Sequence, residues 1–93
     1  MTMSIQLMDN ERGFEVKNAA GEQVGRIVWA LDDNVMVMNG TFIDESLRGQ
    51  NMGEQLLDEA AKYAAEHHYK MKAVCPYVVK KFNMTDKYAH LEA

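Results

Sequence analysis

The stretch LRGQNMGEQLLDEAA, Leu47–Ala61, is the most informative part of the chain, because a glycine-bearing turn runs directly into a helix here. From Met52 to His68, apolar residues recur at spacings of three and four, and charged residues fall mainly on the other face. This period predicts an amphipathic helix of about five turns. Its alanine-rich stripe would let the helix lie close against a sheet.

Around this helix, alternating apolar residues and β-branched or aromatic residues predict strands. The predicted strands are Phe14–Asn18, Val24–Leu31 and Val35–Ile43 before the helix and Lys70–Cys75 after it, with Ser4–Met8 as a further candidate. A short helix over Tyr77–Phe82 follows Pro76. The predicted order is therefore β-β-β-α-β-α.

The long helix connects two predicted strands, so these strands should be parallel neighbours in a βαβ unit. Asn39-Gly40 interrupts the strand before the helix, and a glycine inside a strand often marks a bulge. We therefore expect an α/β (α+β) fold around one mixed sheet. Because 93 residues leave no room for a second core, residues 1–93 should form a single domain.

Composition narrows the classes of function. The net charge of −4 argues against a nucleic-acid partner, whose binding depends on neutralising phosphates. No apolar run is long enough to span a membrane, and the first residues predict no secretory signal, so a cytoplasmic location is expected. A single cysteine excludes an internal disulfide, and without a spaced ligand set we expect no metal site.

The turn before the long helix has two interpretations. Free backbone N–H groups and the helix dipole would bind a phosphate there, since glycines allow a ligand to approach the backbone. Alternatively, Asn51 and Glu54 have the spacing of a capping box, in which side chains satisfy those donors. The local sequence slightly favours the cap, whereas the position after a strand in a βαβ unit favours the phosphate site.

The segment Arg48-Gly49-Gln50-Asn51-Met52-Gly53 resembles the Arg/Gln-x-x-Gly-x-Gly/Ala motif of GNAT-type N-acetyltransferases. Together with KMKAVCPYVVKKF, Lys70–Phe82, and the tail Asp86-Lys87-Tyr88, it resembles the small, single-domain members of that family. The resemblance covers nearly all of the chain from Phe14 onward. It implies a minimal GNAT-like fold, acetyl-coenzyme A (acetyl-CoA) as cofactor, and transfer of the acetyl group to a primary amine.

The resemblance also implies where the cofactor binds. Loop amides would hold the pyrophosphate of coenzyme A, and a backbone amide of the strand before the helix would hold the thioester carbonyl. The implied cofactor-binding residues are Phe42, Ile43, Arg48, Gly49, Gln50, Asn51, Met52 and Gly53. Asn51 stands where the motif has its first glycine, and asparagine is the best non-glycine residue for a left-handed backbone.

Cys75 is the predicted catalytic residue. It ends a parallel strand, where ligand crevices form in open α/β sheets. It could accept an acetyl group as a nucleophile or protonate the departing thiolate, and the alternative is a small buried thiol. Close relatives in the resembled family commonly carry a histidine where this chain has Gly40.

Two functions therefore remain open at the level of sequence. One is an N-acetyltransferase acting on a small amine or a protein lysine. The other is a binding module that holds coenzyme A or an acyl-CoA without transferring the group.

Overall fold

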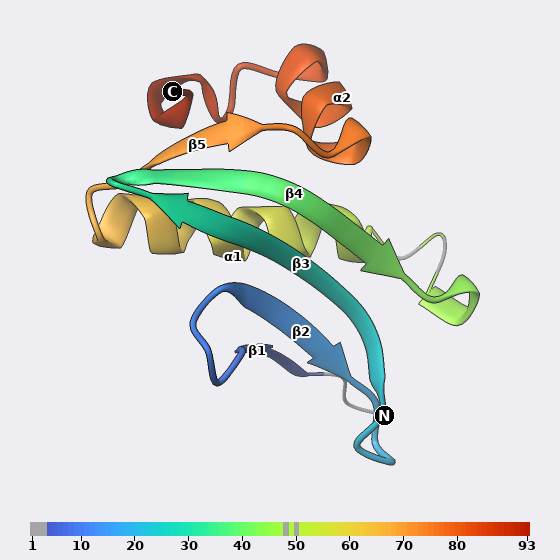
Figure 1. Ribbon diagram of the computed structural model, residues 1–93. Coiled ribbons are helices and arrows are strands. Elements are labelled where there is room, and N and C mark those ends of the chain that lie inside the picture. Colours follow the sequence, from blue (N-terminus) through green and yellow to red (C-terminus); the bar gives the residue numbers. More distant parts are fainter. Residues whose placement is uncertain (1–3, 48, 50) are drawn as a thin grey trace.

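The computed structural model describes residues 4–47, 49 and 51–93, which form a five-stranded sheet with two α-helices (Figure 1). In chain order the elements are β1 (Ser4–Leu7), β2 (Gly13–Lys17), β3 (Gln23–Asp32), β4 (Val35–Ile43), the 3-10 turn η1 (Glu45–Leu47), α1 (Met52–Glu66), β5 (Lys70–Ala73), α2 (Pro76–Met84) and the 3-10 turn η2 (Ala89–Leu91).

The strands lie in sequence order across the sheet, β1-β2-β3-β4-β5. The first four are antiparallel neighbours, whereas β4 and β5 are parallel, with Val35 opposite Lys70 and Met38 opposite Ala73. The predicted mixed sheet and its parallel βαβ unit are confirmed. The predicted order lacked one strand, because β1 is short, lies at the edge and buries little of its length.

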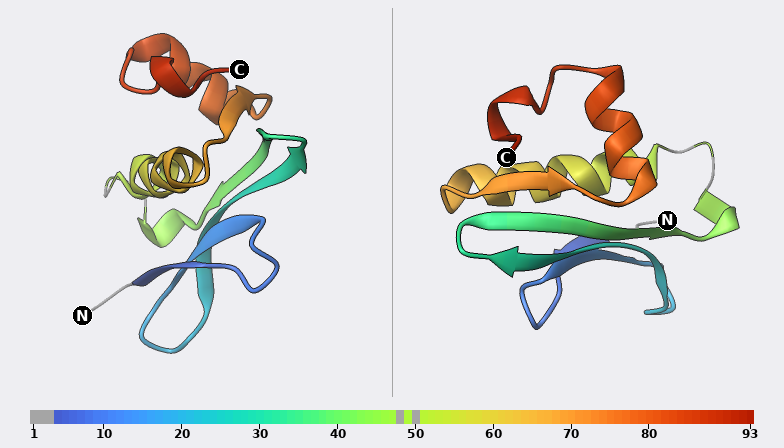
Figure 2. Two further views of the ribbon diagram at one scale, coloured as in Figure 1. Left: turned by 90° about the vertical axis from the view of Figure 1, so that its left-hand side faces the viewer. Right: turned by 45° about the horizontal axis from the view of Figure 1, so that its top comes forward.

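Helix α1 lies across one face of the sheet (Figure 2). Its stripe residues Leu56, Leu57, Ala60 and Ala64 are fully buried, as the period of three and four predicts. They belong to one core with the inward residues of the strands, which are Phe14, Val16, Ile27, Trp29, Met36, Met38 and Met71. None of the helices formed by residues 4–47, 49 and 51–93 has both the length and the apolar character needed to cross a membrane.

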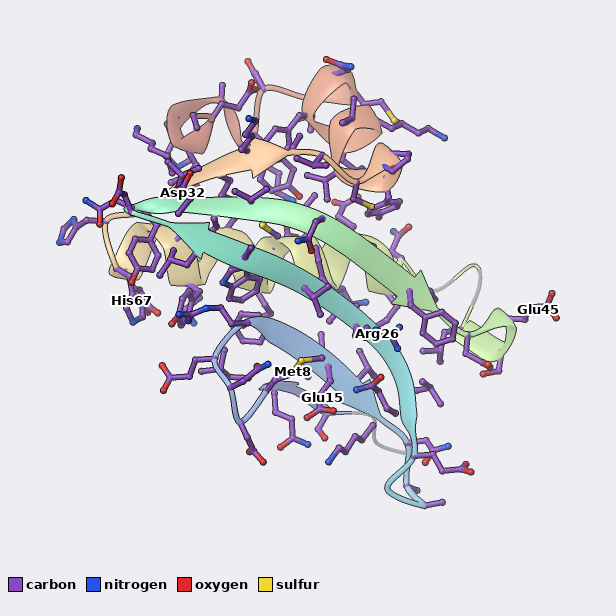
Figure 3. All side chains as sticks on the ribbon, in the orientation of Figure 1. Met8, Glu15, Arg26, Asp32, Glu45 and His67 are labelled. Atoms are coloured by element: carbon purple, nitrogen blue, oxygen red, sulfur yellow. The ribbon has the colours of Figure 1, made fainter. Side chains whose placement is uncertain are left out.

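The other face of the sheet is mixed, because successive residues of a strand point to opposite faces and place both charged residues and residues such as Val28 and Val37 there. Glu15 on β2 and Arg26 on β3 are register partners, and both are labelled in Figure 3. Gln23 links them, since its amide donates to Glu15 (2.9 Å) and accepts from the Arg26 guanidinium (3.1 Å). The βαβ half of the molecule, rather than this face, carries the predicted site.

Candidate functional site

The bulge predicted at Asn39-Gly40 is present in β4. Val28 of β3 pairs with Gly40 and Trp29 pairs with Met38, so Asn39 is the extra residue. A one-residue bulge reverses which edge of the strand each later peptide group faces. Asp44 N–H donates to Val24 of β3 (2.8 Å), and therefore the peptide groups of Thr41 and Ile43 face the β5 side.

Strand β5 leaves β4 at this bulge. The Met38 carbonyl accepts hydrogen bonds from both Val74 N–H (3.2 Å) and Cys75 N–H (2.8 Å), and the ladder ends with the Met38–Ala73 pair. Beyond it, the Thr41–Ile43 end of β4 has no β5 residue opposite it in the ladder of the described chain. The two parallel strands thus separate at their carboxyl ends, where ligands bind in open α/β sheets.

Cys75 lies at the point of separation and precedes the first residue of α2. Its side chain is buried, with Sγ 3.5 Å from Oγ1 of Thr41. The thiol donates in this contact when protonated, and the hydroxyl can rotate to donate to a thiolate.

The pKa of the Cys75 thiol is set by opposing effects. Burial raises it, but hydrogen bonds from the Thr41 hydroxyl and from the backbone N–H groups of Val78, Tyr77 and Thr41 outweigh burial, so the pKa is lowered. A cysteine at a helix N-terminus is a typical setting for a reactive thiolate.

The N-terminus of α1 is not closed by a capping box. Asn51, the N-cap residue, adopts a left-handed backbone (φ 55°, ψ 29°) and its side chain makes no capping hydrogen bond. Gly49 is also left-handed, with φ 86°. The capping-box interpretation is therefore wrong, and Asn51 takes a left-handed backbone conformation that favours glycine or asparagine.

Gly53 allows α2 to pack against the first turn of α1. A Cβ atom at Gly53 would lie 2.6 Å from Oη and 2.8 Å from Cζ of Tyr77. Gly53 is buried, and the Tyr77 ring occupies the space that a side chain at this position would need. This packing places the α2 face that carries Tyr77, Lys80 and Lys81 beside the start of α1.

A pocket of about 280 Å³ lies between these elements. Its lining residues come from the end of β4, the turn before α1, the first residues of α1 and α2, and they are Ile43, Leu47, Gly49, Asn51, Met52, Gly53, Tyr77, Lys80 and Lys81. None of the lining residues is acidic, although the chain as a whole has a net charge of −4. The pocket therefore suits an anionic ligand.

The pocket brings together most of the predicted cofactor-binding residues. Ile43, Gly49, Asn51, Met52 and Gly53 line it. Its lysines come from α2, whose residues were not among the predicted cofactor-binding residues. Lys80 and Lys81 follow Tyr77 by three and four residues, and this spacing places the three side chains on one face of a helix.

The remaining three predicted cofactor-binding residues are Phe42, Arg48 and Gln50. Phe42 is 43% exposed and lies under the Arg26 guanidinium (5.1 Å to the ring centroid), outside the pocket lining. Arg48 and Gln50 lie outside the described residues.

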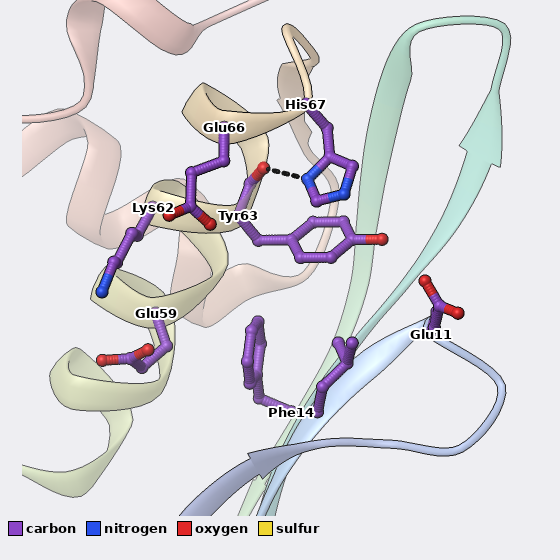
Figure 4. A pocket seen from close by; sticks show the side chains of 8 residues that line it. Glu11, Phe14, Glu59, Lys62, Tyr63, Glu66 and His67 are labelled. Carbon is purple, nitrogen blue, oxygen red and sulfur yellow. Dashed lines mark hydrogen bonds between the residues drawn. The ribbon is translucent and has the colours of Figure 1, made fainter.

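A second pocket, of about 350 Å³, lies near the other end of α1 (Figure 4). It combines the rings of Phe14, Tyr63 and His67 with the side chains of Leu7, Glu11, Glu59, Lys62 and Glu66. His67 stacks on Tyr63 with ring centroids 4.0 Å apart, and its Nδ1 lies 2.9 Å from the Tyr63 carbonyl oxygen. The sequence predicted no site at this pocket.

Comparison with known proteins gives a consistent result. The family model described as GCN5-related N-acetyl-transferase matches residues 13–91. A GCN5-like protein from Staphylococcus aureus has the same fold, with a TM-score of 0.78 and 22% identity over 97% of this chain and 87% of that one. No curated protein matches the chain.

Two larger proteins also share the fold. An acetyltransferase from Bacillus cereus matches with a TM-score of 0.64 and 24% identity over 82% of this chain. A GNAT family N-acetyltransferase from Escherichia coli, solved in complex with CoA, matches with a TM-score of 0.57 and 24% identity over 61% of this chain. The match covers only 63% of the B. cereus chain and 35% of the E. coli chain.

The family model covers residues 13–91. This range includes the bulged β4, the separated β5 and the N-terminus of α1 that the Asn51 side chain does not cap. The protein belongs to the GCN5-related N-acetyltransferase family.

Proposed function

We propose that the protein transfers the acetyl group of acetyl-CoA to a primary amine, of either a small molecule or a protein lysine. The observation that carries this proposal is the position of Cys75. Its thiol contacts Thr41, two residues before Ile43, and Ile43 lines the anion-suited pocket at the start of α1. A reactive thiol and a phosphate-binding site would then serve the two ends of one cofactor.

The residues present fit coenzyme A. The first turn of α1 has N–H groups that its N-cap side chain does not satisfy, and left-handed Gly49 and Asn51 turn the chain into that helix. These groups would hold the diphosphate. The Thr41–Ile43 end of β4 would bind the pantetheine arm and the thioester carbonyl through its backbone.

Bound acetyl-CoA supplies the acetyl group as a thioester. Because hydrogen bonds favour its thiolate form, Cys75 is suited to attack the acetyl carbon. A new carbon–sulfur bond forms to Sγ, the bond to the CoA sulfur breaks, and CoA leaves as a thiolate. The amine then attacks the S-acetyl group, the carbon–sulfur bond to Sγ breaks to release the Cys75 thiolate, and the proton lost by the amine passes through solvent to the CoA thiolate.

Acidic groups follow β4 and would favour a cationic acceptor. The Asp44 carboxylate accepts hydrogen bonds from the hydroxyl (2.6 Å) and the backbone N–H (3.0 Å) of Ser46, and these bonds lower the pKa of Asp44. A fixed negative charge at this point would attract an ammonium group before it loses its proton.

The non-catalytic alternative has one observation in its favour. Gly40 brings no side chain to the bulge, where the resemblance to the family implies a histidine, and a Cβ there would already lie 3.0 Å from Val28 Cγ2. A module of this kind would bind coenzyme A through the α1 pocket and leave the acetyl group in place.

Incubation with acetyl-CoA and panels of amines and lysine peptides separates the two functions. We expect acetylated product from wild type and at least about a hundredfold slower transfer by Cys75→Ala, with CoA affinity retained. Intact-protein mass spectrometry in the absence of acceptor should show one added acetyl group on wild type and none on the variant. CoA binding without product on any acceptor would support the module instead.

A further inference from the structure

Two lysines of α2 suggest a part of the cofactor site that lies outside the family motif. Lys80 and Lys81 line the pocket at the start of α1, together with Gly49, Asn51 and Gly53. They bring two positive charges to a pocket whose lining contains no acid. The motif loop supplies backbone donors, whereas these side chains come from a separate helix.

Lys81 is held in place by neighbours on both sides. Its side chain is only 20% exposed, and its Nζ lies 5.8 Å from the centre of the Tyr77 ring. Tyr77 itself packs on Gly53, as shown above. The ammonium group is therefore positioned before any ligand arrives, which reduces the entropy cost of ordering it.

The acid nearest to Lys81 is shared with a second lysine. Glu54 accepts one contact from Lys81 Nζ (3.1 Å) and another from Lys87 Nζ (3.3 Å), and both lysines lower the pKa of Glu54. Lys87 in turn contacts Asp58 at 2.8 Å. Glu54 thus keeps a second cationic partner, Lys87, when Lys81 also contacts a ligand.

Glu54 also occupies the third position of α1, where a free carboxylate would repel a phosphate at the helix N-terminus. Lys87 belongs to the segment after α2, so the C-terminal part of the chain compensates this charge. The arrangement lets a helix with an acidic first turn accept an anion.

We propose that Lys80 and Lys81 bind the phosphates of coenzyme A, and that Lys87 neutralises Glu54 so that Lys81 is available to do so. This inference rests on the proposed function, because it assigns part of the same cofactor site. The chemistry is that of a polyphosphate ligand held between a helix N-terminus and two ammonium groups.

Isothermal titration calorimetry with CoA, dephospho-CoA and acetyl-pantetheine tests the assignment. We expect Lys81→Gln to weaken CoA binding about tenfold or more, as loss of a charge-assisted hydrogen bond does. Lys80→Gln should weaken it less, because Lys80 is exposed. The matched control is Lys62→Gln, which removes the same charge from the pocket at the other end of α1.

The three ligands identify the group that the lysines contact. Acetyl-pantetheine has no diphosphate, so the lysine variants should bind it as wild type does. If the effect on CoA disappears with dephospho-CoA, the contact is to the 3′-phosphate; if it persists, the contact is to the diphosphate. An equal loss for all three ligands would overturn the assignment, since it would indicate a general defect in the fold.

The role of Lys87 is tested by a double-mutant cycle with Glu54. Lys87→Gln should weaken CoA binding in the wild-type background and have little effect in Glu54→Gln, because the charge to be neutralised is then absent. Equal effects in both backgrounds would contradict this role. If wild type binds none of the three ligands, the proposed function fails; if it binds CoA and Lys81→Gln binds equally well, only the lysine assignment fails.

Discussion

At the scale of single residues, Cys75 shows how hydrogen bonds can override burial. Transfer from water into the protein disfavours a thiolate, but the Thr41 hydroxyl and the first N–H groups of α2 favour it, and the balance lowers the pKa. Of the groups that lower it, the Thr41 hydroxyl contributes most and can be removed without changing the backbone.

Replacing Thr41 with valine should therefore raise the pKa of Cys75. Alkylation of the thiol by iodoacetamide proceeds through the thiolate, so its rate rises with pH through this pKa. The profile of wild type should lie at lower pH than that of a free cysteine, and the profile of Thr41→Val should move to higher pH. Coincident profiles for the two proteins would show that Thr41 does not stabilise the thiolate.

Asn51 is the second residue whose conformation matters for the site. A left-handed backbone at φ 55° strains most residues, and glycine least. Asn51→Ala should lower the free energy of unfolding by about 1 kcal/mol in urea denaturation, whereas Asn51→Gly should leave it nearly unchanged. Equal stability of the alanine variant and wild type would mean that Asn51 is not left-handed in solution.

At the scale of elements, the packing of α2 on α1 depends on one missing side chain. A Cβ on Gly53 would lie within 2.6–2.8 Å of the end of the Tyr77 ring. Because Gly53 has no side chain, Tyr77 can approach α1 closely and bring the α2 lysines near the start of that helix.

Gly53→Ala should consequently destabilise the protein, although alanine normally gains about 1 kcal/mol over glycine in a helix. Overpacking costs about 1–3 kcal/mol, which exceeds that gain. In a Tyr77→Leu background the clash is relieved, and the same substitution should become neutral or stabilising. An unchanged sign in thermal unfolding of the two backgrounds would refute the packing argument.

Much at this scale could be predicted from the sequence. The helix from Met52 was predicted because apolar spacing marks the buried stripe, and the bulge at Asn39-Gly40 because glycine weakens a ladder. The edge strand β1 was uncertain, since Ser4–Leu7 is too short and too exposed to give a clear alternation. The open helix N-terminus was not predictable locally, because Asn51 and Glu54 have the spacing of a capping box and the partners of Glu54 are distant in sequence.

At the scale of the whole molecule, the segment after α2 is bound to the first half of α1. Lys87 contacts both Glu54 and Asp58, and the Tyr88 hydroxyl donates to Asp58 at 2.6 Å. Tyr88 is buried and stacks on Phe82 of α2, with ring centroids 5.5 Å apart. The C-terminal part of the chain thereby supports the helix that lines the site.

This tie should make stability depend on pH through Glu54. Hydrogen bonds from Lys81 and Lys87 lower its pKa in the folded state. Their contribution is therefore present above the pKa of an unfolded glutamate and is lost as pH falls through the folded value. Urea denaturation at neutral and acid pH should show a smaller loss on acidification for Glu54→Gln than for wild type, and an equal loss would contradict it.

The parallel β4–β5 pair that would carry the proposed site was also predictable at this scale, whereas the position of the α2 lysines was not. Cys75 was predicted to end one of two parallel strands and the turn before α1 to follow the other, and the carboxyl ends of parallel strands share an edge of the sheet. The contribution of Lys80 and Lys81 depends on how α2 is turned, which the Gly53–Tyr77 contact sets and no local pattern encodes.

The proposed cofactor site depends on backbone N–H groups between Gly49 and Glu54, which would bind the diphosphate of coenzyme A. Titration of the ¹⁵N-labelled protein with CoA, followed by amide chemical shifts, tests it directly. We expect the largest saturable shifts at Gly49, Asn51, Met52, Gly53 and Glu54, with little change at His67 at the far end of α1. Unchanged amides from Gly49 to Glu54 under saturating CoA, or shifts concentrated around His67, would contradict this assignment.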